Sequence, residues 1–144
     1  MVCLGNICRS PLAEGILKSK IDSNKVLVDS AGTGNWHVGQ LPDPRSIEVA
    51  KKHGIDLTNQ RGRQFTQKDF EAFDCIFVMD NSNMKDVLNL AQNNSGKEKV
   101  RLILDELFPA ENVDVPDPYY GGEQGFESVY QMLDKACNEI AKRL

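Results

Sequence analysis

The sequence predicts an α/β fold, a three-layer sandwich in which a four-stranded parallel sheet carries helices on both faces. Short apolar runs alternate along the chain with segments of helical periodicity, and this order is typical of parallel strands joined by helices. The length of 144 residues suits one domain, 1–144, with a full core. Cys3 and Asp80 follow two of the strand-like runs, and parallel sheets of this kind bind ligands beyond the carboxyl ends of their strands.

Each element follows from a local pattern. The first strand is the short apolar entry Met1–Val2, ahead of Cys3. Apolar residues, many of them β-branched, cluster in three further predicted strands, at 26–28, 76–79 and 100–104. Helical periodicity predicts helices that begin after residues 10, 42, 81 and 124. Pro11 is expected at the first helical position, because its φ is already helical and it has no N–H to leave unpaired.

A thiol and an arginine lie close together near the start of the chain, in Cys3-Leu4-Gly5-Asn6-Ile7-Cys8-Arg9-Ser10-Pro11. This stretch is a loop that enters a helix, so several backbone N–H groups point to its concave side and the helix dipole adds to their field. Such a loop binds phosphate, and its field favours the anionic, nucleophilic form of a thiol at Cys3. Arg9 can hold two phosphate oxygens at once, and Ser10 can donate its hydroxyl to the thiolate.

An aspartate near the far end of the chain can supply the acid that phosphoester hydrolysis needs, because an alkoxide or aryloxide leaves poorly without a proton. Asp117 precedes Pro118 in a loop that ends in two glycines. This context fixes it in an extended or turn conformation, from which it can project over a pocket. For this segment alone, an ordinary Asp-Pro turn is the alternative.

The composition argues against several classes of function. The 17 Lys and Arg residues against 21 Asp and Glu give a net charge of −4, which is unlike a nucleic-acid surface. The sequence has no transmembrane run, so we expect no membrane partner. His37 and His53 are far apart and have no ligand-spaced cluster around them, so we expect no metal and no cofactor. Four cysteines without a secretory signal indicate a reduced, cytoplasmic protein.

The two loops together resemble those of the low-molecular-weight protein tyrosine phosphatases, in Val2–Pro11 and in Asp117-Pro118-Tyr119-Tyr120. Segments between the loops resemble the same family in the same order: Asp29-Ser30-Ala31-Gly32-Thr33, Trp36, Val38-Gly39, Asp43-Pro44-Arg45, His53-Gly54-Ile55, Arg63-Gln64-Phe65, and Phe73-Asp74 through Met79-Asp80. The resemblance covers essentially the whole chain. It implies a phosphotyrosine phosphatase I-like fold of the Rossmann or flavodoxin type.

The resemblance also implies a mechanism. Cys3 would attack phosphorus to give a phosphocysteine, and Asp117 would protonate the leaving oxygen and then act as base for water. Arg9 and the loop amides would stabilise the transferring group. Substrate would contact the remaining loop residues Leu4, Gly5, Asn6, Ile7, Cys8 and Ser10. Asn6, Ser10 and Ser30 would keep the loop in shape. The implied partners are phosphotyrosyl proteins, with inorganic phosphate and similar oxyanions in the active site.

Aromatic residues indicate the substrate class. By resemblance, Trp36 and Tyr119 would wall a deep slot that suits a phosphotyrosyl ring, with Tyr120 as a further neighbour. The alternative for Trp36 is a partly buried residue that anchors its own loop. Asp80, which follows the strand predicted at 76–79, could orient Arg9 or could cap the next helix.

Two features depart from the family pattern. Only Met1 and Val2 precede Cys3 where relatives have several apolar residues of a central strand, so we expect that the chain lacks a few residues of that strand. Many relatives have a histidine in the phosphate-loop network where Gln60 stands here. An amide can both donate and accept, so the network can persist with an altered pH response.

Cys8 lies within the loop, five residues from Cys3. By resemblance, the two thiols would form a reversible disulfide that protects Cys3 from irreversible oxidation. The alternative is a small buried side chain that packs the loop.

Three other functions stay open. Arsenate reductases of this fold relay oxidation through further cysteines in the region that corresponds to 81–96, where this sequence has none. By resemblance, a phosphoarginine phosphatase would have Thr at the position of Ile7 and a smaller slot than Trp36 and Tyr119 suggest. A non-catalytic phosphoprotein-binding domain would be expected to lack Cys3 or Asp117, and both are present. The sequence therefore favours hydrolysis of phosphotyrosine.

Overall fold

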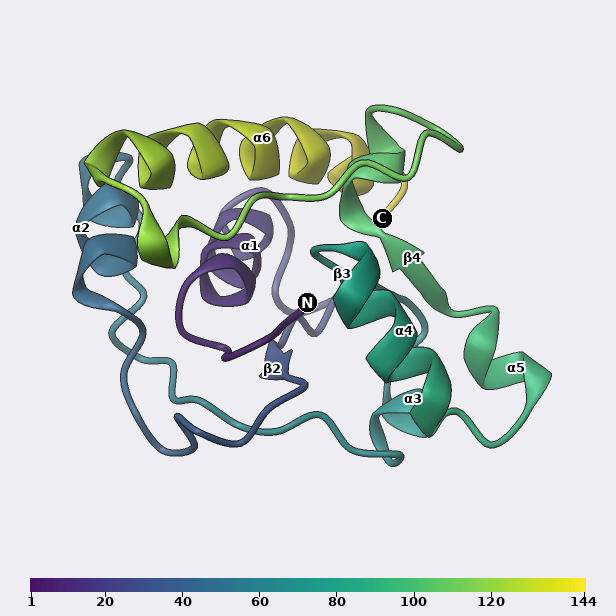
Figure 1. Cartoon of the computed structure of the whole chain (residues 1–144). Coiled ribbons are helices and arrows are strands. Elements are labelled where there is room, and N and C mark those ends of the chain that lie inside the picture. Colours follow the sequence, from purple (N-terminus) through teal and green to yellow (C-terminus); the bar gives the residue numbers. More distant parts are fainter.

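The computed structural model describes residues 1–144, except for the side chain of Glu123. Its centre is a parallel four-stranded sheet with the strand order β2-β1-β3-β4 (Figure 1). The strands are Val2–Cys3 (β1), Ala31–Gly32 (β2), Ile76–Val78 (β3) and Val100–Leu102 (β4). The predicted α/β fold class is confirmed.

Helices cover both faces of the sheet and complete the three layers (Figure 1). On one face, three helices pack against one another: α1 (Arg9–Lys18), α2 (Pro44–Lys52) and α6 (Glu123–Ala141). The other face carries α4 (Asn81–Leu90), with the short α3 (Asp69–Ala72) beside it. The single turn α5 (Asn94–Lys97) precedes β4, and two 3₁₀ turns follow it, η1 (Ile103–Glu106) and η2 (Pro118–Tyr120).

Side chains of the strands alternate between two hydrophobic cores, as the pleat of a sheet requires. Cys3 and Phe77 point into the core shared with α1, α2 and α6. The neighbouring strand positions point into the core shared with α3 and α4, namely Val2, Ile76, Val78, Val100 and Leu102. Both faces of the sheet are therefore buried, which is the usual state of a parallel sheet.

The strand predicted at 26–28 is wrong. That segment has irregular backbone, and its Leu27 side chain is 76% exposed, while the strand forms later, at Ala31–Gly32. The register explains the difference. Val2 pairs with Ala31, so residues 26–28 precede the region where β1 runs beside this segment, and an isolated extended segment has no ladder to join.

Other boundaries shift by a few residues. Helix α1 begins at Arg9, so Pro11 lies within its first turn instead of at its first position. The backbone N–H of a first-turn residue needs no partner inside the helix, so proline is tolerated there. The last predicted strand ends at Leu102, and the chain continues as η1. The helices predicted after residues 42, 81 and 124 are confirmed as α2, α4 and α6.

The strand order creates a crevice at one edge of the sheet. The chain places β2 on one side of β1 and then β3 on the other side, so the connections after these strands diverge. At such a reversal, ligands bind outside the carboxyl ends of the strands. Cys3 ends β1, and Asp80 lies two residues after the end of β3. Among the described residues, no helix combines the length and apolar content needed to cross a membrane.

Gly15 allows α1 to approach the core closely. A Cβ there would lie 2.5 Å from Leu57 Cδ2 and 3.0 Å from Ile55 Cγ2, and Leu57 is fully buried. We expect Gly15→Ala to lower the free energy of unfolding by about 1–2 kcal/mol, because overpacking outweighs the gain in helix propensity. Urea unfolding measures this. Ser82→Ala, at an exposed position of α4, reports propensity alone, and a stabilised Gly15→Ala protein would contradict the expectation.

Candidate active site

Residues 3–9 form a tight loop between β1 and α1. Three of its carbonyl oxygens are held on the outside by backbone N–H groups at 2.8–2.9 Å: Cys3 by Thr33, Leu4 by Gly34, and Ile7 by Asp43. With these carbonyls turned outward, loop N–H groups are left for the concave side, where the N-terminal end of the α1 dipole adds to their field. The loop therefore has the character of an anion site.

Asn6 determines the shape of this loop. Its backbone is left-handed, with φ of 56°, a conformation that is costly for residues other than glycine but tolerated by asparagine. The buried side chain holds it there. Its Nδ2 donates to Ser10 Oγ at 2.8 Å and to Ser30 Oγ at 3.0 Å, and its Oδ1 accepts from the Arg63 backbone N–H at 3.0 Å. The Asn6 N–H itself lies 3.3 Å from Cys3 Sγ, as a donor to the sulfur.

A buried carboxylate stands at the far end of this hydrogen-bond chain. Glu14, on α1, accepts from Ser30 Oγ at 2.7 Å and from Lys18 Nζ at 2.6 Å. Because an ionised carboxylate can only accept, Ser30 gives its one proton to Glu14 and accepts from Asn6. Ser10 also accepts from Asn6, so its own proton can go to Cys3 Sγ at 3.0 Å or to the Ala31 carbonyl at 3.5 Å.

The expected supporting roles of Asn6, Ser10 and Ser30 thus have a physical basis. The structure adds Glu14 and Arg63, which the sequence analysis did not identify. Asn6 and Ser10 were also expected to contact substrate. Both side chains are buried behind the loop, with the residues 3% and 0% exposed, and their hydrogen bonds go to the supporting network.

Arg9 is buried at the start of α1, and three segments converge on its guanidinium. Nη1 donates to Asp80 Oδ2 at 2.7 Å and to the Val115 carbonyl at 2.9 Å, while Nη2 lies 3.7 Å from Asp117 Oδ2. Asp80 also accepts from the Asn83 N–H at 2.8 Å and so caps α4. Both roles considered for Asp80 are therefore present, since one oxygen orients Arg9 and the other caps the helix.

The sequence-predicted site residues, apart from Asn6, Ser10, Ser30 and Asp80, line one cavity of about 290 Å³. Asp117, the residue before η2, reaches into this cavity. Its side chain is 36% exposed, and its Oδ1 accepts from the Tyr119 N–H at 3.0 Å. Trp36 is 65% exposed, and its ring also lies against Gly34 of its own loop, where an added Cβ would be 2.0 Å from Trp36 Cζ3. The cavity is lined by Cys3, Leu4, Gly5, Ile7, Cys8, Arg9, Trp36, His37, Asp117, Tyr119 and Tyr120.

His37 is a lining residue that the sequence analysis did not identify. Its Nδ1 lies 2.9 Å from Gln40 Oε1, which holds the ring against the phosphate loop. A Cβ on Gly5 would be 3.3 Å from His37 Cδ2, so the absence of a side chain at Gly5 allows this close approach. The only sequence signal was its position directly after Trp36.

Gln60 does not replace the family histidine within the loop network. Its Nε2 donates to the Pro11 carbonyl at 3.0 Å, on the first turn of α1. Its Oε1 is buried and has no hydrogen-bond partner among the described residues. The glutamine therefore supports the first turn of α1.

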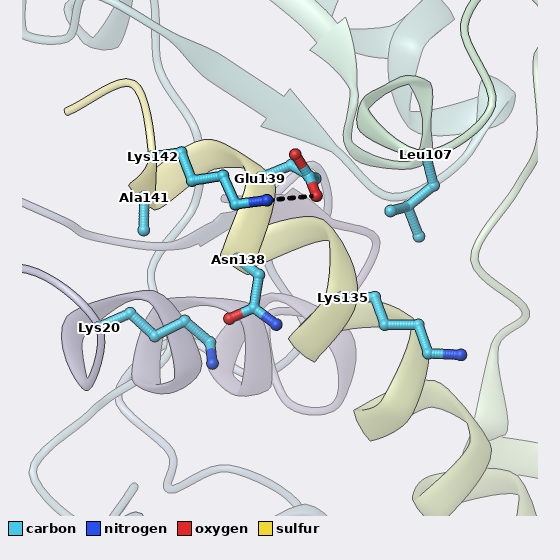
Figure 2. A pocket seen from close by; sticks show the side chains of 7 residues that line it. All are labelled: Lys20, Leu107, Lys135, Asn138, Glu139, Ala141 and Lys142. Carbon is cyan, nitrogen blue, oxygen red and sulfur yellow. Dashed lines mark hydrogen bonds and ion pairs between the residues drawn. The ribbon is translucent and has the colours of Figure 1, made fainter.

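A larger hollow of about 670 Å³ lies away from this site, between α6, Lys20 and Leu107 (Figure 2). Three lysines line it, but Lys20 lies 2.8 Å from Asp134, and Lys142 lies 3.1 Å from Glu139. These carboxylates offset two of the three positive charges. No arginine lines the hollow, whereas the buried Arg9 guanidinium lines the cavity around Cys3.

Comparison with known proteins agrees with this geometry. The family model described as low molecular weight phosphotyrosine protein phosphatase matches residues 1–144. The chain belongs to this family. A phosphatase of that name from Schizosaccharomyces pombe is 43% identical over 143 residues, which is 95% of this chain and 90% of that protein. The resemblance inferred from the two loops is confirmed, and the relatives of this chain are named as protein tyrosine phosphatases.

Solved structures of the family superpose closely on this one. The protein tyrosine phosphatase of Entamoeba histolytica, with Hepes in its active site, has a TM-score of 0.89 and 39% identity, covering 99% of this chain and 92% of its own. Vibrio vulnificus Wzb in complex with benzylphosphonate has a TM-score of 0.88 and 32% identity, covering 99% and 95%. A Drosophila arginine phosphatase has a TM-score of 0.88 and 36% identity, covering 99% and 94%.

Burial distinguishes two of the cysteines of this phosphatase, Cys8 and Cys137, from the exposed Cys75. Burial raises the pKa of the Cys8 thiol to about 12, and the nearby Asp43 carboxylate adds to the effect. Burial likewise raises the pKa of Cys137 to about 12, whereas Cys75 is exposed. At pH 8, a thiol with a pKa near 12 is ionised in roughly one molecule in 10⁴.

We therefore expect iodoacetamide at pH 8 to modify Cys75 in the native protein and to leave Cys8 and Cys137 unmodified. Peptide mass spectrometry after a short reaction reads out each site separately. The urea-unfolded protein is the control, in which all four cysteines should react. Modification of Cys8 in the native state at the rate of Cys75 would contradict the expectation.

We expect Glu14→Met to slow the carboxymethylation of Cys3 by iodoacetate about tenfold. Without the carboxylate, Ser30 loses its acceptor and holds the Asn6 amide less firmly, so the loop and Ser10 beside Cys3 are less well fixed; one hydrogen bond to a charged group is worth about 1.5 kcal/mol. Glu14→Gln keeps an acceptor for Ser30 and should react at close to the native rate. Lys18→Met removes only the outer partner of Glu14, and equal slowing in all three variants would show that the bond between Ser30 and Glu14 is not the cause.

Proposed function

We propose that this protein hydrolyses phosphotyrosine in other proteins through a phosphocysteine intermediate on Cys3. The observation that carries the proposal is the meeting of three groups at one cavity. Cys3 Sγ lies 3.0 Å from Ser10 Oγ and accepts from the Asn6 N–H, the buried Arg9 guanidinium lies beside the loop, and Asp117 Oδ2 lies 3.7 Å from Arg9 Nη2. Such a set suits a nucleophile, an anion clamp and a proton donor.

In the first step, the Cys3 thiolate would attack phosphorus while the bond to the tyrosyl oxygen breaks. The leaving oxygen would take the proton of Asp117, so that tyrosine departs neutral and a phosphocysteine remains. In the second step, water would attack phosphorus and give its proton to Asp117, while the thiolate leaves and inorganic phosphate is released. One proton enters and leaves Asp117 in each cycle, so the enzyme returns to its starting state.

Arg9 and the loop amides would stabilise the equatorial oxygens during both transfers. Arg9 is already oriented by Asp80 and the Val115 carbonyl, so little reorganisation is needed when charge develops. These groups supply the electrophilic assistance, and we propose that turnover requires no metal. We further propose that the enzyme acts in the cytoplasm, where low-molecular-weight thiols keep Cys3 reduced.

The lining of the cavity supports an aryl phosphate as substrate. Trp36 and Tyr119 stand at its rim, and a ring bound between them would gain on the order of 1 kcal/mol beyond area burial. Phosphoarginine is the second candidate, because the Drosophila arginine phosphatase is 36% identical to this chain. Ile7 in the loop and the two aromatic side chains favour tyrosine, since a flexible guanidinium stem gains less from a flat slot.

The test compares phosphate release from a phosphotyrosyl, a phosphoseryl and a phosphoarginyl peptide in the presence of EDTA. Cys3→Ser should abolish turnover, and Asp117→Asn should lower kcat/KM for phosphotyrosine by about 10²- to 10⁴-fold. Trapping of ³²P on the acid-quenched enzyme should label the native protein and leave Cys3→Ser unlabelled.

A preference for the phosphoarginyl peptide would move the assignment to the second candidate. Loss of activity in EDTA that Mg²⁺ or Zn²⁺ restores would refute the metal-independent mechanism. Exposed Cys75→Ser is the matched control for Cys3→Ser and should retain full turnover.

A further inference from the structure

Arg45 makes an unusual set of contacts next to the active site. It is the second residue of α2, and its side chain folds back onto the residue that caps that helix, Asp43. The Arg45 N–H and Nε both donate to Asp43 Oδ1, at 2.8 and 3.0 Å, and Nη2 donates to Oδ2 at 3.0 Å. Three donors of one residue thus hold one carboxylate, which fixes the plane of the guanidinium.

The same turn of α2 is attached to the phosphate loop. The Asp43 N–H donates to the Ile7 carbonyl at 2.8 Å, and Ser46 Oγ donates to the Cys8 carbonyl at 3.3 Å. These bonds tie α2 to the outward-facing side of the loop. The Arg45 guanidinium is therefore held in a fixed position relative to Cys3 and Arg9.

The Arg45 guanidinium also lies over two aromatic rings, Tyr119 and Phe126, which come from the side of the site that carries Asp117. Its Cζ lies 5.4 Å from the centre of the Tyr119 ring and 4.6 Å from the centre of the Phe126 ring. Phe126 is buried at the start of α6, so it is a fixed base, whereas Tyr119 is 41% exposed and belongs to the loop that carries Asp117. The Tyr119 N–H donates to Asp117 Oδ1, so displacement of Tyr119 displaces the carboxylate.

We propose that Arg45 is a positioning residue, which clamps the Tyr119 ring against a support fixed to the phosphate loop and so holds the Asp117 carboxylate over Cys3. This proposal rests on the function proposed above, because Asp117 must act as the proton donor. The guanidinium connects the two halves of the site, the loop at residues 3–9 and the loop at residues 117–120. In Figure 1 the first loop belongs to the purple start of the chain and the second to the green segment that leads into α6.

The charge state of the clamp is constant near neutral pH. Burial alone would raise the pKa of the Asp43 carboxyl, but the hydrogen bonds from Arg45 outweigh burial and hold that pKa below its usual value. Both partners therefore stay charged wherever the enzyme would work. Lysine could supply the charge over the rings but not the planar fork on Asp43, so arginine is needed for the complete set of contacts.

The experiment compares Arg45→Met with native enzyme on a series of substituted phenyl phosphates. Protonation of the leaving group matters most when that group is strongly basic, so a displaced Asp117 should harm phenyl phosphate more than 2,4-dinitrophenyl phosphate. We expect kcat/KM for phenyl phosphate to fall about three- to tenfold in Arg45→Met, with a much smaller change for the dinitrophenyl ester. Competitive inhibition by inorganic phosphate should be unchanged, because Arg9 and the loop remain intact.

A double-mutant cycle shows whether the effect passes through Tyr119. In a Tyr119→Leu background, Arg45→Met should cause less than a twofold further change in kcat/KM for phenyl phosphate. Solvent exchange of the Tyr119 amide proton, measured by NMR, should be faster in Arg45→Met than in native protein, and this readout does not depend on turnover. Arg101→Met, at an exposed position of the edge strand β4, is the matched arginine control.

Three outcomes would overturn the proposal: Arg45→Met behaving like Arg101→Met, an equal loss for all esters together with weaker phosphate inhibition, or the full effect persisting with Leu at position 119. The second of these would mean that Arg45 acts on the phosphate loop, and the third that it touches substrate directly. If Arg45→Met does not fold, Arg45→Lys is carried through the same cycle, with the same pattern expected at a smaller size. If native enzyme releases no phosphate from any ester, the proposed function fails, while the amide-exchange measurement still tests the clamp.

Discussion

The left-handed backbone of Asn6 is the constraint on which the active site depends. Holding a non-glycine residue in that conformation costs on the order of 1 kcal/mol or more, and the cost must be met by neighbouring contacts. Here the buried amide of Asn6 makes bonds to Ser10, Ser30 and the Arg63 N–H. Each bond also fixes a second group, so one side chain determines both the curvature of the loop and the position of the Ser10 hydroxyl beside Cys3.

The buried guanidinium of Arg9 makes the fold and the anion site interdependent. A guanidinium that is 2% exposed requires charged or polar partners, because leaving a buried charge unpaired costs several kcal/mol. Its partners come from Asp80, just after β3, and from the segment between η1 and η2 that carries Val115 and Asp117. The Val115 N–H donates to the Met79 carbonyl at 2.8 Å, so this segment runs beside the end of β3 and brings residues 115 and 117 to the arginine at position 9.

The sequence was sufficient for the fold class, three of the four strands, the major helices, and the three residues that the structure brings together at the cavity, Cys3, Arg9 and Asp117. Apolar runs and helix signals are local, and the Cys3 loop carries its own chemistry in adjacent residues. The prediction of a strand at 26–28 was wrong because an apolar pattern does not determine which residues pair with β1. The supporting roles of Glu14 and Arg63 could not be predicted for a related reason. Glu14 accepts from Ser30, 16 positions away, and the Arg63 backbone N–H donates to Asn6, 57 positions away, so neither role is visible in the local sequence.

Two carboxylates flank Arg9, and their surroundings explain why they would act differently. Both oxygens of Asp80 receive hydrogen bonds, from Arg9 at 2.7 Å and from the Asn83 N–H at 2.8 Å, so both are engaged by the fold. Asp117 Oδ2 is 3.7 Å from the guanidinium, beyond hydrogen-bond distance, and faces the cavity. A group in the cavity can therefore reach Asp117 Oδ2 without breaking a hydrogen bond that the fold makes. Asp80 orients the Arg9 guanidinium, and Asp117 is the carboxylate that would exchange a proton with substrate and water.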